Sequence, residues 1–202
     1  MLTHRFLRDQ FRAYRMWILE RPAGAGGAPA DVAGDSAPIE YTFLDRHARR
    51  DWTIRASTND EWQQYQVALA REHDLVLATS KGETLGWAWI GYEQVHLAPL
   101  GRKIHLGSRT GYLYDAFVRP AARGQGIGRG LVRARCARAD AQGMERLLTH
   151  VLVANQPSLR ALDSQGFRTV GRTVFVRALA LRVWTREPLP TARHLVHIGA
   201  SV

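Results

Sequence analysis

Short apolar runs and longer amphipathic stretches alternate along most of this chain. Apolar runs bounded by turn residues predict strands, and two of them, 74–80 and 84–92, flank the turn Lys81-Gly82-Glu83 and predict a hairpin. Stretches with an apolar residue every three or four positions predict helices. The other predicted strands are 39–44, 52–57, 111–118 and 146–153, with a strand pair or one bent strand over 167–181, and the predicted helices are 58–73, 131–142 and 156–166. This order predicts an α/β domain in which helices flank a mixed central sheet.

The N-terminal 21 residues have a different pattern. Phe11, Tyr14, Trp17 and Ile18 recur close to a helical repeat, and arginines stand between them. This predicts a basic amphipathic helix over 1–21, which can dock on its own domain, on a partner or on an anionic membrane. Residues 22–38 are rich in Gly, Ala and Pro and predict a flexible linker. We therefore expect three parts: helix and linker over 1–38, the main domain over 39–187, and a tail over 188–202.

The composition and net charge of the chain indicate which class of partner it binds. The 202 residues are 46% hydrophobic and 23% charged, as in globular proteins, but 28 Lys and Arg against 18 Asp and Glu give a net charge of +10. A positive surface favours an anionic partner: a phosphorylated cofactor, a membrane or nucleic acid. We do not expect nucleic acid, because the arginines are scattered among acids and no recognition motif is present.

Cysteine and histidine offer little further chemistry. Cys136 is the single cysteine, so it forms no internal disulfide, and His194 with His197 is an isolated close pair without an HExxH pattern. We therefore expect no metal site. No apolar run approaches the roughly 18 residues of a membrane span, and we expect a cytoplasmic protein.

Glycine occupies every second position in the stretch RGQGIGRG, 123–130, at the start of a predicted helix. Glycine in a helix costs roughly 1 kcal/mol relative to alanine, so this cluster needs a reason. It is not a Walker A loop, because Gly128 precedes Arg129 and Gly130 rather than Lys and Ser or Thr, and it does not fit GxGxxG. A strand, a turn and glycines at a helix N-terminus direct free backbone N–H groups and the positive end of the helix at one point. Such an arrangement suits a bridging diphosphate.

At these residues the chain resembles the GCN5-related N-acetyltransferase (GNAT) superfamily. The cofactor loop of that family reads (Gln or Arg)-x-x-Gly-x-(Gly or Ala), and here Arg123-Gly-Gln-Gly126-Ile-Gly128 follows the strand YDAFV and the turn RPAA. A second block, NQPSLRALDSQGF, with Asn155, Ser158 and Gly-Phe at its end, is similar to the segment after the family's fifth strand. The resemblance extends from about Trp52 to Val176 and implies the GNAT fold, with a central, mostly antiparallel mixed sheet flanked by helices.

The resemblance also implies a site for acetyl-CoA or another acyl-CoA, without a metal. Loop amides would hold the pyrophosphate, the backbone of Phe117 and Val118 would pair with the pantetheine arm, and Asn155 would reach the same arm from the neighbouring strand. The implied function is transfer of an acyl group, acetyl first, to the amine of a small molecule or peptide. The implied cofactor-binding residues are Phe117, Val118, Arg123, Gly124, Gln125, Gly126, Ile127, Gly128 and Asn155.

Two residues bear on the proton chemistry. Asp115 lies in the strand before the loop, and we predict that it assists the attacking amine, since aspartate is disfavoured inside strands. Its ordinary pKa of about 3.9 lies roughly 6 units below that of a lysine-like amine, so it would act through water, through a raised pKa or by attracting the cation. The family's usual acid is a tyrosine seven residues after the asparagine, where this chain has Leu162. Water or a hydroxyl of Tyr112, Tyr114 or Ser164 would then protonate the thiolate.

The acceptor is not readable from the sequence, and other functions remain open. Trp87, Trp89 and Tyr92 either line an acceptor pocket or pack in the core. The missing tyrosine leaves a non-catalytic module that binds coenzyme A as the alternative to an enzyme. A membrane or partner contact through residues 1–21 is a third reading.

Overall fold

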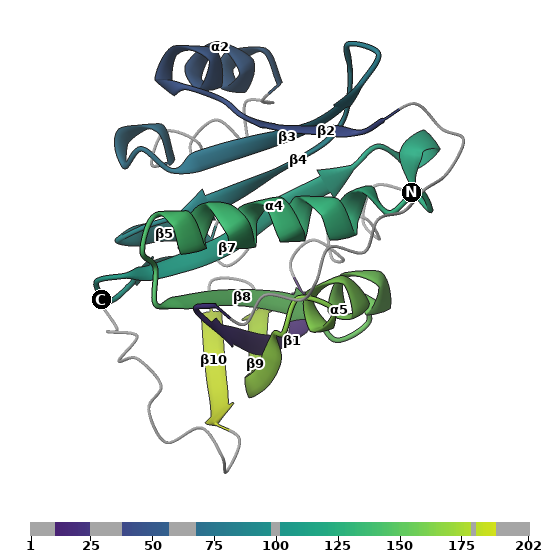
Figure 1. Ribbon diagram of the computed structural model, residues 1–202. Helices are drawn as coiled ribbons and strands as arrows, with labels where there is room; N and C mark the ends of the chain where they lie inside the picture. Colours follow the sequence, from purple (N-terminus) through teal and green to yellow (C-terminus); the bar gives the residue numbers. More distant parts are fainter. Residues whose placement is uncertain (1–10, 25–37, 57–67, 98–101, 179–180, 189–202) are drawn as a thin grey trace.

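The structure, a computed structural model, describes residues 11–24, 38–56, 68–97, 102–178 and 181–188 (Figure 1). Eight of its strands form one sheet in the order β10-β9-β1-β8-β7-β4-β3-β2, and β5 with β6 forms a separate hairpin. Neighbouring strands of the described sheet are antiparallel except for β7 and β8, which run parallel. The strands are β1 (Phe11–Pro22), β2 (Glu40–Phe43), β3 (Asp74–Ser80), β4 (Glu83–Gly91), β5 (Gln94–Leu97), β6 (Arg102–His105), β7 (Thr110–Val118), β8 (Arg146–Leu152), β9 (Arg168–Ala178) and β10 (Leu181–Pro188). The expected mixed, mostly antiparallel sheet is confirmed.

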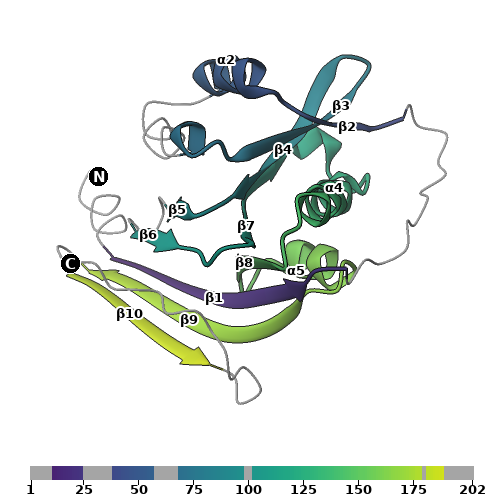
Figure 2. The ribbon, with the colours of Figure 1, turned by 60° about the vertical axis from the view of Figure 1, so that its left-hand side comes forward.

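Helices cover one face of the sheet, and a β-hairpin covers part of the other. The helix α4 (Ile127–Ala141) crosses one face beside α5 (Gln156–Asp163), and the β5–β6 hairpin lies on the opposite face (Figures 1 and 2). Leu131 and Val132 of α4 are buried in two clusters on their side, one with Val76 and Ala88 and the other with Leu113. The hairpin buries Val95 and Ile104 on the other side, in a cluster with Met16, Tyr112 and Leu148. The two faces therefore carry separate cores.

Two sequence predictions are wrong, and the first concerns residues 52–57. They do not form a strand, because α2 (Arg46–Ala56) runs through most of this segment. Asp45 starts the helix, and its Oδ1 accepts from the backbone N–H of Ala48 at 2.9 Å. Arg49 and Thr53 are 5% and 0% exposed, and the ring of Trp52 lies edge-on to that of Trp87 at 5.2 Å. The buried face thus has helical spacing, but an arginine and a threonine in it hide the period.

The second wrong prediction is the N-terminal helix. Residues 11–22 form β1, which lies between β8 and β9 inside the sheet, while residues 1–10 and 25–37 lie outside the described part of the chain. Met16 and Leu19 of β1 are buried on opposite faces, as a central strand requires. Arg21, 1% exposed, points inward and donates to both carboxylate oxygens of Asp140 in α4 at 3.0 Å. Arg21 at the end of this segment is therefore a buried member of an ion pair rather than a solvated residue.

Candidate active site

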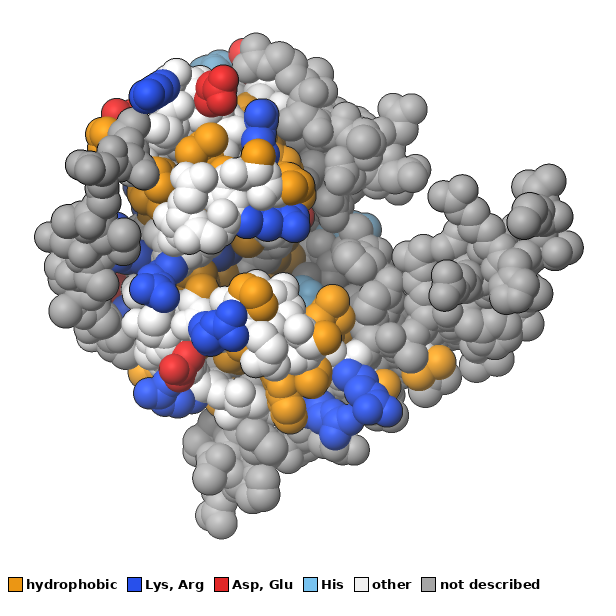
Figure 3. Space-filling model, turned by 90° about the vertical axis from the view of Figure 1, so that its right-hand side faces the viewer, with side chains coloured by type: hydrophobic (Ala, Val, Ile, Leu, Met, Phe, Trp, Pro, Cys, Tyr) orange, Lys and Arg blue, Asp and Glu red, His pale blue; other side chains and the backbone are white. Residues whose placement is uncertain are grey.

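The site begins where the two parallel strands separate. β7 and β8 pair from Thr110 with Arg146 to Leu113 with Thr149 and no further. At this last pair the Thr149 hydroxyl donates to the carbonyl oxygen of Leu113 at 2.8 Å. Beyond it, the described pairing leaves β7 with β4 alone and β8 with β1 alone, so one edge of each strand is open. Figure 3 looks onto this end of the molecule and shows the surface indented between two lobes, with Lys and Arg side chains along the indentation.

A β-bulge deforms β7 just past the point of separation. Trp89 of β4 is opposite Tyr114 and Trp87 is opposite Phe117, so two residues of β7, Asp115 and Ala116, face one of β4. Asp115 has a φ of 45°, a conformation that few non-glycine residues adopt. The predicted catalytic aspartate is therefore the bulged residue, and it is exposed at the mouth of the opening.

A buried arginine supports the bulge from α4. Arg135 is 3% exposed, and its Nη1 donates to the carbonyl oxygen of Trp89 at 3.2 Å. Burial lowers the pKa of Arg135 to about 10, whereas the nearby charge of Asp115 acts to raise it. The helix that carries the glycine loop is thus tied directly to β4, the strand that pairs with the bulged strand β7.

The glycine loop presents bare backbone at the N-terminus of α4. Gly126 is the helix N-cap with a φ of 76°, no side chain caps the helix, and its first turn carries no acid. A Cβ atom at Gly124 or Gly126 would meet nothing within 4 Å, and one at Gly128 would touch only Val118 at 4.0 Å. Gly130 differs, because a Cβ atom there would overlap the ring and hydroxyl of Tyr41 from β2. Three glycines therefore leave open space above the amides, and the fourth admits a neighbouring strand.

The other predicted cofactor-binding residues border the same opening. Phe117 is 37% exposed with its ring 4.5 Å from that of Trp87, and the Nε of Arg123 donates to the carbonyl oxygen of Val118 at 3.2 Å. Asn155 follows β8 across the opening and caps α5, its Oδ1 accepting from the backbone N–H of Ser158 at 3.2 Å. Its side-chain nitrogen has no partner among the described residues. Both walls of the opening thus end in the residues that the sequence singled out.

The position of the usual tyrosine is closed to the opening. Leu162 is 4% exposed and packs with Phe167 and Leu19 in the core. Ser164, one of the candidate substitutes, donates to the carbonyl oxygen of Ala161 at 2.8 Å. Neither side chain is placed to act at the bulge.

The other two candidate hydroxyls each contact a histidine that the sequence analysis did not single out. The Oη of Tyr114 lies 2.8 Å from Nδ1 of His73, whose Nε2 lies 3.2 Å from the carbonyl oxygen of Tyr92. Burial lowers the pKa of His73 to about 4, so the ring is neutral at pH 7, and because a carbonyl only accepts, Nε2 carries the proton and Nδ1 accepts from Tyr114. The hydroxyl of Tyr112 contacts Nδ1 of His150 at 2.6 Å. A polar histidine inside an apolar strand run, THVLV, was the available signal for this second pair.

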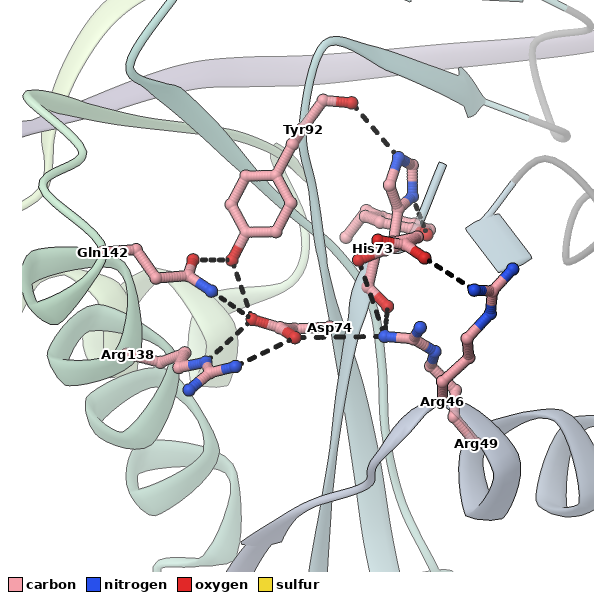
Figure 4. Close-up of polar contacts among 9 residues, drawn as sticks. Arg46, Arg49, His73, Asp74, Tyr92, Arg138 and Gln142 are labelled. Carbon is pink, nitrogen blue, oxygen red and sulfur yellow. Dashed lines mark hydrogen bonds and ion pairs between the residues drawn. The ribbon is translucent and has the colours of Figure 1, made fainter. Parts of the chain in front are cut away.

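A second polar network lies at the C-terminal end of α4, away from the glycine loop (Figure 4). Asp74, at the start of β3, accepts from Tyr92 Oη at 3.0 Å, from Arg138 Nε at 2.9 Å and from Gln142 Nε2 at 3.0 Å. The side chain of Arg49 on α2 approaches the same carboxylate at 3.9 Å. This network joins β3, α2 and the end of α4 to the residue that follows β4, and it commits Tyr92 to a structural contact rather than an acceptor pocket.

The other chemistry considered from the sequence finds no support here. Cys136 is buried, and burial raises the pKa of its thiol to about 11, so it is not a nucleophile at neutral pH. Among the described residues, no three His, Cys, Asp or Glu side chains gather as a metal site would need. None of the described helices is long and apolar enough to cross a membrane.

Comparison with known proteins agrees with this arrangement. A family model described as the acetyltransferase (GNAT) family matches residues 41–167. Mycothiol acetyltransferase of Acidothermus cellulolyticus is 27% identical over 137 residues, 65% of this chain and 40% of that protein. The Amycolatopsis mediterranei protein of the same name is 32% identical over 96 residues, 48% of this chain and 30% of that protein. This chain therefore matches less than half the length of either relative.

A solved structure shares the fold. The GCN5-related N-acetyltransferase from Sphaerobacter thermophilus superposes with a TM-score of 0.55 at 15% identity, over 94% of this chain and 58% of that one. The family model covers more than half of the chain and includes β7, the bulge, the glycine loop and α5. The chain belongs to the GNAT acetyltransferase family.

Proposed function

We propose that the protein is an acyl-CoA-dependent N-acyltransferase that transfers acetyl from acetyl-CoA to the amine of a small molecule or peptide. The observation that carries this proposal is the open edge of β7 next to an uncapped, acid-free helix N-terminus. An extended chain ending in a diphosphate needs both features, one for the chain and one for the phosphates. The cytoplasmic location expected from the sequence stays a prediction.

Each part of the donor has a matching part of the opening. Backbone amides over 124–128 bind the pyrophosphate, since a Cβ atom at Gly124 or Gly126 would stand in open space and none is present to obstruct an anion. Phe117 and Val118 pair their backbone with the pantetheine arm, because β8 has already separated from this part of β7. Asn155 donates to the same arm through its side-chain nitrogen while its oxygen caps α5.

Asp115 serves the acceptor. Its exposed carboxylate lies on the bulge, where it attracts a cationic amine and orients it toward the thioester. The structure gives no reason for this carboxyl to take a proton directly from an amine of ordinary basicity. The names of the two mycothiol acetyltransferases favour acetyl as the donor group and a small molecule as the acceptor.

Calorimetry of acetyl-CoA binding tests the proposal. Gly126→Glu places a carboxylate above the loop amides, and Gly143→Glu is the matched control, because Gly143 also has a positive φ of 72° and open space but lies beyond the other end of α4. We expect binding to the wild type and the control and at least a tenfold loss in Gly126→Glu. Equal binding by both variants, or no binding by the wild type, refutes the site.

One alternative is a module that binds coenzyme A without turnover. It is favoured by the buried Leu162, which stands where the family usually has its acidic tyrosine. Release of free thiol in the presence of a panel of primary amines separates the two functions. Binding with no thiol release above the rate of acetyl-CoA alone, across the panel, supports the module.

A further inference from the structure

His150 lies at the apex of the opening between β7 and β8. It is the first residue of β8 beyond the last pair with β7, Leu113 with Thr149. Its Nδ1 contacts the hydroxyl of Tyr112 across the two strands at 2.6 Å. The side chain is half-buried, and its second nitrogen, Nε2, has no hydrogen-bond partner among the described residues. One ring nitrogen is therefore fixed and the other is left for a ligand.

The surroundings keep this histidine neutral. The described neighbours are apolar: Ile18 pairs with it from β1, and Met16, Val95 and Ile104 pack around Tyr112 from β1 and the β5–β6 hairpin. Burial lowers the pKa of His150 to about 4, with no charged group contributing, and burial raises the pKa of Tyr112. Tyr112 is the titratable group that faces it. At neutral pH the ring is therefore uncharged and has a free position. Because its pKa is as low as that of an ordinary carboxyl, it does not deprotonate a free amine. It takes the proton only once nitrogen has bonded to the thioester carbon and has become acidic, and the protonated ring is then a strong acid toward the thiolate.

We propose that His150 is a catalytic residue that takes the proton of the attacking amine on Nε2 and delivers it to the sulfur of the leaving thiol. The proposal rests on the acyl transfer proposed above. The cationic amine first loses one proton to water. Nitrogen of the neutral amine then bonds to the thioester carbon, the carbon–sulfur bond breaks, and its electron pair leaves with sulfur. One proton passes from nitrogen to Nε2 and then to the thiolate. Amine and thioester become amide and thiol, and His150 returns to its neutral form without a further reactant.

Tyr112 is the positioning residue in this scheme. With the proton of the neutral ring on Nδ1, that N–H donates to the Tyr112 oxygen and leaves the lone pair of Nε2 exposed. The same contact stabilises the ring when it is transiently protonated. A shuttle of this kind removes the need for a tyrosine at position 162.

The other histidine–tyrosine pair does not compete for the role. Both nitrogens of His73 are engaged, by Tyr114 and by the carbonyl oxygen of Tyr92. His73 is 1% exposed and adjoins Asp74 at the start of β3. It is therefore a matched control: a buried neutral histidine bound to a tyrosine, but without a free nitrogen.

Nitrogen-15 NMR of the histidine-labelled full chain tests the proposal without an acceptor. Coenzyme A and desulfo-coenzyme A, which lacks the sulfur, are added in turn. We expect coenzyme A, but not the desulfo analogue, to shift Nε2 of His150, with His73 unmoved by either. Equal shifts with the two ligands, or no shift of His150 while the amides of 124–128 respond, overturn the role of His150 and leave the cofactor site intact. No response anywhere refutes the cofactor site and this proposal together.

Kinetics then separate catalysis from packing. His150→Gln retains an N–H group that can donate to the Tyr112 oxygen and loses the base. With an acceptor amine from the thiol-release panel, we expect its rate to fall about 100-fold or more, as is typical for loss of a general base, with unchanged affinity for coenzyme A. Added imidazole should restore part of the rate in His150→Gly, and His73→Gln should retain most of the wild-type rate. A His150→Gln rate within threefold of wild type overturns the proposal.

Discussion

The buried ion pair between β1 and α4 should respond very differently to the loss of each partner. Arg21 is 1% exposed, whereas the side chain of Asp140 is 32% exposed, although the two share two hydrogen bonds of 3.0 Å. In Asp140→Asn the guanidinium stays buried without a counter-charge. In Arg21→Met the carboxylate that remains is reached by water. The pair is therefore symmetric in its contacts and asymmetric in its exposure.

The structure sets the size of the difference. Removing one partner of a buried pair costs about 3 to 5 kcal/mol, and we expect this range for Asp140→Asn. Arg21→Met leaves a hydrated carboxylate and deprives the buried carbonyl oxygen of Gln165 of its 3.0 Å bond from Nε, so we expect about 1 to 3 kcal/mol. With a urea slope of about 2 kcal/mol/M, the midpoint of unfolding should fall by about 1.5 to 2.5 M in Asp140→Asn and by about 0.5 to 1.5 M in Arg21→Met.

Equilibrium urea unfolding, followed by tryptophan fluorescence, measures both losses. The double variant Arg21→Met/Asp140→Asn should be close to Arg21→Met alone, because the buried charge is gone in both. Equal losses in the two single variants would refute the reasoning from exposure. Losses below about 0.5 kcal/mol in both would refute the position of β1 inside the sheet.

Two further predictions concern stability. Gly128→Ala should raise the free energy of unfolding by up to about 1 kcal/mol through helix propensity. The free energy of unfolding of Gly130→Ala should be about 1 to 3 kcal/mol lower than that of Gly128→Ala, because Tyr41 must move. The reverse order in urea unfolding would refute this packing of Tyr41 on Gly130. Since burial lowers the pKa of His73 from 6.5 to about 4, the unfolded chain binds more protons between these values, and stability should fall as the pH is lowered through this window. His73→Gln should flatten that slope, and an unchanged slope would contradict the burial of a neutral ring.

Much of the fold and part of the site could be predicted from local sequence. The hairpin of β3 and β4, the strand before the glycine loop, and α4 and α5 all lie where apolar periodicity and turn residues placed them. The glycine loop was readable because its chemistry is local: positive φ angles, a helix start and missing side chains occur within six residues. Asp115 stood out for a similar reason, as an acid in an apolar strand.

Contacts between distant segments could not be predicted in this way. Arg21 and Asp140 are 119 residues apart, and Tyr112 and His150 are 38 apart, so no spacing rule joins them. Arg49 hides the helical period of α2 because its guanidinium is buried against the backbone carbonyls of Glu72 and His73, just before β3. An arginine is expected to be solvated unless its partner is known.

The sequence by itself determined the GNAT loop, the hairpin of β3 and β4, the order of elements from β7 to α5, and the departure at Leu162, because each depends on neighbouring residues. Only the tertiary structure decided that residues 11–22 form a central strand, that β7 bulges at Asp115, and that β7 and β8 separate after Leu113 and Thr149. The physical reason is that a strand's pairing, and the environment of a buried charge or imidazole, depend on side chains brought together only when the sheet forms.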